Sequence, residues 1–223
     1  MALRTQGLDE KITQSAKDEF LKYGYKDASI NRIAKNAGAT SGAIYIRYKN
    51  KDEIFRSLVD IPMNGMQEQF NQYKGRYSAL GQKQDWEKLN SLDAEIFDWI
   101  IDYMYENYDA FKLLICKSDG SSVSNFASDF IHFKFQKTYE FIEKIIVPLE
   151  NTTNEFLGVP ISKEEISLLS SAQYHSLFEV LHHDYSKKDA KKYLTTLRNI
   201  YANGIYALLK DFVDTNQLSG TLL

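Results

Sequence analysis

The segment from Ser29 to Lys51 gathers side chains that can hold an anion or read a hydrogen-bonding edge. Arg47 carries a planar guanidinium whose parallel donors suit the O6 and N7 acceptors of guanine. Lys49 and Lys51 add point charges, and the Tyr45 hydroxyl can donate to a phosphate oxygen. Chemistry of this kind is typical of a surface that binds a nucleic-acid backbone.

Two short helices are predicted to position these side chains. Ser29 is a good N-cap for a first helix that contains Ile33 and Ala34. Gly38 then stands where the end of a helix commonly needs a left-handed residue. Thr40 can cap a second helix. Two short helices joined by a turn that contains glycine are typical of a helix-turn-helix.

The second helix of such a motif enters the major groove of DNA with its N-terminal residues first. Here we expect Ser41, Gly42, Ala43, Ile46 and Arg47 to be its exposed residues. Arg47 is the strongest base reader among them, Ser41 can bond donors or acceptors, and Ala43 can touch a thymine methyl. Gly42 allows the backbone to approach the DNA closely. Ile33, Ala34, Ile44 and Tyr48 are expected to form the small core that joins the two helices.

About a dozen residues of this segment follow one ordered pattern. The run from Ile33 to Gly38 fits I-A-x-x-A-G, that from Thr40 to Tyr45 fits S/T-x-G-x-L/I-Y, and that from Lys51 to Ile54 fits K-x-x-L/I. Tyr48 stands where phenylalanine is usual. In this order and spacing the segment resembles the DNA-binding region of the TetR family of bacterial transcriptional regulators.

The resemblance implies that Ser29, Thr40, Tyr45 and Lys51 contact phosphates, and Lys49 adds charge beside them. Such contacts fix the position of the protein on DNA without selecting a sequence. For Tyr45 the alternative is a partly buried packing residue. The family often has a polar or aromatic residue at the position of Ile46, so base recognition is expected to rest on few side chains.

Helical periodicity continues along the chain and predicts an all-α fold of about nine helices. We expect helices at 8–23 (ended by Gly24), from 51 towards 73 (capped by Asn50 with Glu53), from 86, at 108–116, 123–147 and 162–183, and from 186 through 212 (capped by Ser186), with loops at 75–84 and 117–122. Pro62 predicts either a kink or a helix boundary. The resemblance implies that residues 1–50 form a helix-turn-helix DNA-binding domain and that residues 51–223 form an effector-binding and dimerisation bundle.

Charge is distributed unevenly along the chain. Residues 1–56 carry eleven Lys/Arg and seven Asp/Glu, a net charge of +4. The remainder has a net charge of −7, so the whole chain carries −3. A basic N-terminal part on an acidic remainder suits a protein that binds nucleic acid at one end and another partner elsewhere.

Several other classes of protein are disfavoured. The longest apolar stretch, 96–115, is interrupted by acidic residues, and Met1–Gly7 is polar, so we expect a cytoplasmic protein without a membrane span or signal peptide. The single cysteine, Cys116, allows no internal disulfide and is expected to be a small buried residue. His175 and His182 would lie about 10 Å apart along a helix, too far to chelate one metal ion. Motifs of an enzyme or a cofactor site are not evident, so neither is expected.

Two kinds of partner are expected besides a double-stranded DNA operator. The last two long helices have apolar stripes suited to a homodimer, although the same stripes could face the chain's own core. Aromatic residues could line the site of a small-molecule effector, and plain core packing is the alternative for each of them. These residues are Trp99, Tyr103, Phe130, Phe133, Phe135, Tyr139, Tyr174 and Phe178.

The sequence therefore predicts a DNA-binding transcriptional regulator. The leading hypothesis is a homodimeric repressor that a small-molecule effector releases from a palindromic operator. The alternative is a nucleoid-associated or cell-division factor on the same scaffold, which would bind many sites and sense no metabolite.

Overall fold

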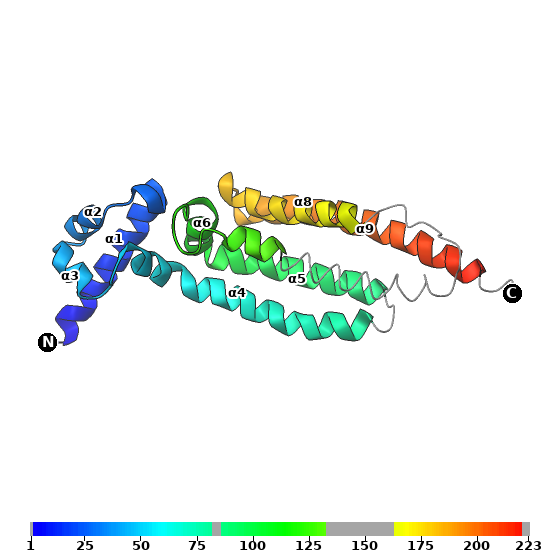
Figure 1. The fold of residues 1–223 in the computed structure, drawn as a ribbon, viewed down its shortest axis with the longest axis horizontal. Helices are drawn as coiled ribbons and strands as arrows, with labels where there is room; N and C mark the ends of the chain where they lie inside the picture. The colour runs from blue at the N-terminus through cyan, green and yellow to red at the C-terminus, as the bar shows by residue number, and fades with distance from the viewer. Residues whose placement is uncertain (1, 82–85, 133–162, 220–223) are drawn as a thin grey trace. The chain divides into compact units, whose positions relative to one another are not determined.

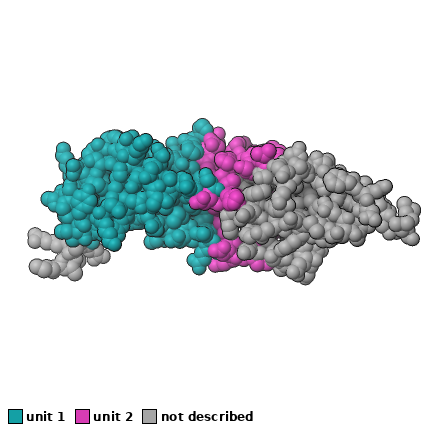
Figure 2. Space-filling model, in the orientation of Figure 1, with its two compact units in different colours: residues 1–68, 103–128, 181–184 teal, residues 69–102, 129–180, 185–223 magenta. Residues whose placement is uncertain are grey.

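The computed structural model describes residues 2–81, 86–132 and 163–219 (Figure 1). These residues contain eight helices, the start of a further helix and no strand, so the predicted all-α class is confirmed. The helix expected at 123–147 is described only at its start, where residues 126–132 are helical. The chain divides into two compact units (Figure 2), the first made of residues 1–68, 103–128 and 181–184, and the second of residues 69–102, 129–180 and 185–223.

Unit 1 begins with α1 (Ala2–Asp27), α2 (Ile30–Asn36), α3 (Ser41–Tyr45) and the first turns of α4 (Lys51–Gly81). We call residues 2–58 the head. The first helix is longer than the predicted 8–23, but Gly24 has the non-helical backbone angles φ 75° and ψ 168°. The chain therefore changes direction where glycine was expected to end the helix.

A continuous apolar core holds the head together. Its members are buried with no more than 2% of their surface exposed, and all four helices contribute to it: Ile12, Ala16, Phe20, Ile33, Ala34, Ile44, Ile54 and Phe55. The rings of Phe20 and Phe55 meet edge to face with centroids 5.1 Å apart. The predicted burial of Ile33, Ala34 and Ile44 is thus confirmed, whereas Tyr48 is half-buried.

The fourth helix differs most from expectation. It runs through Pro62 and on to Gly81, so a helix boundary at Pro62 and the loop at 75–81 were wrong. A proline inside a helix removes one backbone hydrogen bond. Here the buried side chains of Val59, Met66 and Phe70 lie on either side of it. Their packing outweighs the local cost and keeps the helix continuous.

The rest of unit 1 surrounds α6 (Tyr108–Cys116), whose bounds match the prediction. Lys17 of α1 forms an ion pair with Asp109 at 2.8 Å, and the Tyr25 amide donates to the Lys117 carbonyl at 2.7 Å. In the predicted loop at 117–122, the amide and hydroxyl of Ser122 donate to the carboxylate of Asp52 at 2.8 and 2.6 Å. The helix and the loop after it therefore contact both α1 and the start of α4.

Unit 2 contains the second part of α4, most of α5 (Trp86–Glu106) and of α8 (Lys163–His182), and α9 (Lys187–Ser219). Ser186 caps α9, as predicted, by accepting from the Asp189 amide at 3.2 Å. Hydrogen bonds from Lys191 and Lys187 hold the pKa of the Asp102 carboxyl below its usual range, and both lysines lie within 3.0 Å of it. These ion pairs link α5 to α9.

The described ranges contain neither a membrane-spanning helix nor a cluster of metal ligands. Among the helices that the structure describes, none is long and apolar enough to cross a membrane. Within the same residues, no group of three or more His, Cys, Asp or Glu is arranged to hold a metal ion. Cys116 forms no disulfide and is half-buried.

Candidate DNA-binding site

The turn between α2 and α3 is built by local hydrogen bonds. Gly38 has a φ of 66°, in the left-handed region that favours glycine, as the sequence predicted. The Ala39 amide donates to the Ala34 carbonyl at 2.8 Å, which closes the end of α2. Thr40 then accepts from the Ala43 amide at 3.1 Å and caps α3. The two helices are thus held in a helix-turn-helix.

The exposed side chains cluster on the outer face and at the end of α3. Ile46 is 85% exposed and Tyr45 is 54% exposed, whereas Ile44, which joins α3 to the core of the head, is fully buried. Thr40 and Gly42 are exposed, and the remaining predicted contact residues of the helix, Ser41 and Ala43, are half-buried. The packing alternative for Tyr45 is therefore not favoured, because its ring lies largely in solvent.

The helix itself is shorter than its pattern indicated. It ends at Tyr45, so Ile46 and Arg47 follow it. Backbone bonds from the Ile46 amide to the Gly42 carbonyl (3.1 Å) and from the Tyr48 amide to the Ile44 carbonyl (3.0 Å) continue the turn. The chain after α3 therefore still presents Ile46 outward.

Arg47 is placed differently from the prediction of an outward-facing base reader. Its Nε atom pairs with the carboxylate of Asp9 in α1, and its Nη1 atom donates to the Ala43 carbonyl at 3.0 Å. Only 22% of its side chain is exposed. Sequence reasoning missed Asp9 because it lies 38 residues away, and its sole sequence signal is an acidic charge in a basic segment.

A second pair joins the two helices of the motif. The hydroxyl of Ser41 donates to the side-chain oxygen of Asn31 in α2 at 2.7 Å. This bond orients the Ser41 side chain in the absence of DNA. Asn31 is exposed and bonded to Ser41, so it is a further polar group beside the predicted contact residues that the sequence pattern did not identify.

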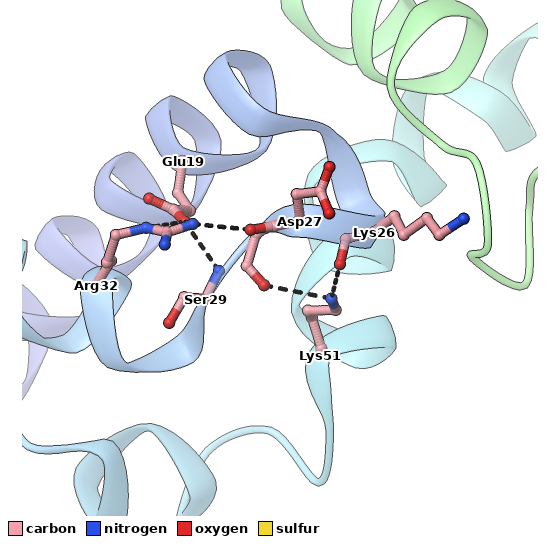
Figure 3. Close-up of polar contacts among 7 residues, drawn as sticks. Glu19, Lys26, Asp27, Ser29, Arg32 and Lys51 are labelled. Atoms are coloured by element: carbon pink, nitrogen blue, oxygen red, sulfur yellow. Dashed lines mark hydrogen bonds and ion pairs between the residues drawn. The ribbon is translucent and has the colours of Figure 1, made fainter.

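Glu19 organises the start of α2 (Figure 3). Its carboxylate is buried, with 3% of the residue exposed, and accepts from the Ser29 amide at 2.8 Å and from Arg32 Nε at 2.7 Å. Arg32 also donates to the Asp27 carbonyl at 2.8 Å. Ser29 is a predicted phosphate contact, and its backbone amide is thus already bonded within the head. A charged pair of this kind fixes α2 against α1.

Lys51 is also engaged within the head. Its ammonium donates to the carbonyls of Lys26 at 3.1 Å and Ala28 at 3.3 Å (Figure 3), and lies 4.7 Å from the centroid of the Tyr25 ring. Burial, reinforced by Asp52, raises the pKa of Tyr25, so the phenol stays neutral. A cation at the end of α1 satisfies carbonyls that the helix leaves open.

The start of α4 carries the predicted capping pair. The side-chain oxygen of Asn50 accepts from the Glu53 amide at 2.8 Å, and the carboxylate of Glu53 accepts from the Lys49 amide at 2.5 Å. In a regular capping box the side chain of Glu53 would accept from the amide of the cap residue Asn50, whereas here it accepts from the amide of Lys49. The capping prediction is confirmed, and the side chain of Lys49 is exposed.

Four of the predicted effector residues have described side chains, and they are divided between the two units. Trp99, Phe130 and Phe178 belong to unit 2, where Phe70 packs edge to face against Phe130 at 5.0 Å and against Trp99 at 6.0 Å. Tyr103 belongs to unit 1 and donates to the Pro62 carbonyl at 3.2 Å.

The remaining effector predictions concern parts that the structure does not describe. Phe133, Phe135 and Tyr139 lie outside the described residues, and of Tyr174 only the backbone within α8 is described. Phe130 and Phe178 are buried, with ring centroids 5.6 Å apart, and Trp99 and Tyr103 are half-buried. An effector site among these residues stays a prediction.

Comparisons with known proteins agree with the motif. Residues 12–58 match the sequence model of the bacterial regulatory proteins of the tetR family. The chain is 23% identical over 197 residues to the HTH-type transcriptional regulator SAB2452 of Staphylococcus aureus, covering 88% of this chain and 93% of the relative. It is 38% identical over 48 residues to the fatty acid metabolism regulator protein of Bacillus subtilis, covering 22% and 25% of the two chains.

A solved structure adds a comparison of folds. The repressor NalD of Pseudomonas aeruginosa, the secondary repressor of the MexAB-OprM multidrug efflux pump, aligns with a TM-score of 0.47 and 19% identity. The alignment covers 91% of this chain and 96% of NalD.

The geometry and the family match lead to one identification. A capped helix-turn-helix with exposed tyrosine, isoleucine and lysine side chains defines a DNA-binding protein. The family match spans this motif together with the core residues that support it from α1 and α4. The chain therefore carries the DNA-binding domain of the tetR family over residues 12–58, and the comparisons support a transcriptional regulator rather than an enzyme.

Proposed function

We propose that this regulator is a homodimeric repressor that a small-molecule effector releases from a palindromic operator. The observation that supports it best is the outer face of α3, where Tyr45 and Ile46 lie in solvent on a helix fixed by Ile44 and the Thr40 cap. A rigid support with a projecting surface is what insertion into the major groove requires.

The anchoring contacts are assigned to Ser29, Thr40, Tyr45, Lys49 and Lys51. Tyr45 and Lys49 are exposed, and a phenol and an ammonium both donate to phosphate oxygens. For Ser29 the available donor is its hydroxyl, because its amide already donates to Glu19. Lys51 can reach a phosphate while it remains near the end of α1.

The reading contacts are assigned to Ser41, Gly42, Ala43, Ile46 and Arg47. Ile46 has the largest exposed apolar surface of the group, and this suits contact with the C5-methyl of thymine. Gly42 is exposed and lets the backbone approach the base edges. Recognition would then combine apolar contact with the guanidinium of Arg47.

Sensing and pairing are assigned to residues 51–223, and DNA binding to residues 1–50. An effector that prefers one arrangement of the aromatic residues would shift the population of DNA-binding states. Pairing through α8 and α9 would place two heads on half-sites about one helical turn apart. A regulator of this kind works in the cytoplasm.

The test starts from a randomised duplex library. We expect the purified protein to enrich a palindrome and to bind it as a dimer, with fluorescence anisotropy falling steeply as salt is added. A genome-wide binding map should show a few promoters. Widespread binding without sequence preference would favour the nucleoid factor instead, and no binding to any duplex would reject the proposal.

A further inference from the structure

Arg47 is the strongest base-reading side chain of the head, yet protein oxygens hold it. Asp9 of α1 pairs with Nε, and the carbonyl of Ala43 accepts from Nη1. The side chain of Arg47 is 22% exposed, while the neighbouring Ile46 is 85% exposed. In the DNA-free head the guanidinium is therefore turned onto the protein.

Recognition of guanine by arginine uses two parallel donors at once. Two of the three guanidinium nitrogen atoms of Arg47 already donate to protein oxygens, and one of these oxygens belongs to a carboxylate. A bidentate contact that uses Nε can form only after the bond to Asp9 breaks. In that geometry the carboxylate and the DNA compete for the same donor.

We propose that Asp9 sets the DNA affinity of the head by holding Arg47 in the DNA-free state. The inference rests on the proposed reading role of the residues that follow α3. Asp9 acts through Arg47 and is a positioning residue, since its own charge has the same sign as the phosphates. It differs from Glu19, whose carboxylate is buried and supports the fold.

The size of the effect follows from exposure. The side chain of Asp9 is 51% exposed, so water and salt weaken the pair. An exposed ion pair contributes little, and its loss changes an equilibrium about two- to fivefold. Asp9 is therefore expected to lower the DNA affinity modestly and in a salt-dependent way, without preventing binding.

The experiment uses Asp9→Asn, which keeps the shape of the side chain and removes its charge. Glu10→Gln is the matched control, because Glu10 is the next acid along α1 and is exposed. On the duplex enriched by the wild-type protein, at about 100 mM salt, Asp9→Asn should bind about two- to fivefold tighter and exceed the control. In an Arg47→Ala background the excess over the control should vanish.

Two results on DNA would overturn the proposal. Weaker binding by Asp9→Asn would mean that Asp9 orients Arg47 for its contact with DNA. The same gain in the Arg47→Ala background would mean that Asp9 acts only as a repelling charge.

A second measurement needs no DNA. Phenylglyoxal modifies accessible guanidinium groups, and peptide mass spectrometry gives the rate for Arg47. We expect faster modification in Asp9→Asn than in the wild type and in Glu10→Gln. An unchanged rate would show that Asp9 does not hold Arg47. Failure of the wild type to bind any duplex would reject the proposed function, while these rates would still decide whether Asp9 holds Arg47.

Discussion

At the scale of single residues, Lys51 combines an observed contact within the head with a predicted contact to DNA. The sequence pattern assigns it to a phosphate, and the structure places its ammonium against the carbonyls of Lys26 and Ala28. These bonds cover the end of α1, where the carbonyls of a helix have no partner within the helix. Loss of this side chain should therefore affect folding as well as DNA binding.

We predict that Lys51→Ala lowers the free energy of unfolding by about 1 kcal/mol, because it removes charge-assisted bonds to backbone carbonyls. It should also weaken binding to all duplexes and reduce the salt slope by about one. Urea unfolding and anisotropy titrations measure the two effects.

Lys49→Ala is the control for Lys51→Ala, since the side chain of Lys49 is exposed. It should weaken DNA binding with unfolding unchanged. Equal stability of Lys51→Ala and the wild type would contradict the capping role.

Sequence predicted the residue-scale features that depend on neighbours in the chain. Gly38, Thr40 and the pair Asn50 and Glu53 were recognisable because caps and turns need fixed residue types at fixed short spacings. The pairs Asp9–Arg47 and Glu19–Arg32 were not predicted. Each joins segments that are separate in the sequence, so it depends on packing that no local pattern contains.

At the scale of elements, α4 and α5 approach closely at one glycine of unit 1. A Cβ atom built on Gly65 would lie 2.2 Å from the Tyr103 hydroxyl oxygen and 3.2 Å from the ring carbon that bears it. The same hydroxyl donates to the carbonyl of Pro62, one turn earlier in α4. The glycine therefore provides the space in which this tyrosine meets the helix.

We predict that Gly65→Ala destabilises the protein by about 1 kcal/mol, although alanine is the better helix former by a similar amount. The clash with the hydroxyl must outweigh the gain in propensity. In a Tyr103→Phe background, where the hydroxyl is absent, the same change should cost less or stabilise. Thermal unfolding of the four proteins completes the cycle.

A stabilising effect of Gly65→Ala in the wild-type background would contradict the close approach of the two helices.

Sequence predicted most helices because their apolar periodicity is strong, and α6 was predicted with its observed bounds. It failed at α4, where Pro62 and the polar stretch after Tyr73 are local signals against a helix. Buried Met66, Phe70 and Tyr73 supply packing energy that a local pattern does not reveal.

At the scale of the whole molecule, large apolar side chains lie in solvent on the last two helices. Leu168 of α8 is 71% exposed and Ile200 of α9 is 65% exposed, beside Tyr193 at 40%. In the single chain these side chains are uncovered, and a second copy could cover them. The observation supports the proposed dimer without depending on an effector.

We predict that Ile200→Glu shifts the protein from dimer to monomer, because a charge placed in an apolar interface loses its water. Analytical ultracentrifugation at micromolar concentration measures the change. Thr195→Glu, also exposed on α9, should leave the dimer intact. An Ile200→Glu protein that remains dimeric would place the interface elsewhere.

The class of the molecule was predictable because its defining pattern is short and contiguous. The effector was not, because its site would combine side chains from several helices, and aromatic residues serve core packing equally well. Trp99 and Phe130 pack with Phe70 in the described part of unit 2, and Phe178 packs with Phe130. Their residue types alone do not distinguish a binding site from a core.

The attachment of α3 has a consequence for how such regulators diversify. Ile44 is the one fully buried side chain of this helix, and Thr40 supplies its cap. Exchanges at exposed Tyr45 and Ile46 alter the surface offered to DNA while the free energy of unfolding changes by about 0.5 kcal/mol or less. After gene duplication, a copy could therefore acquire a new target by few substitutions and still fold.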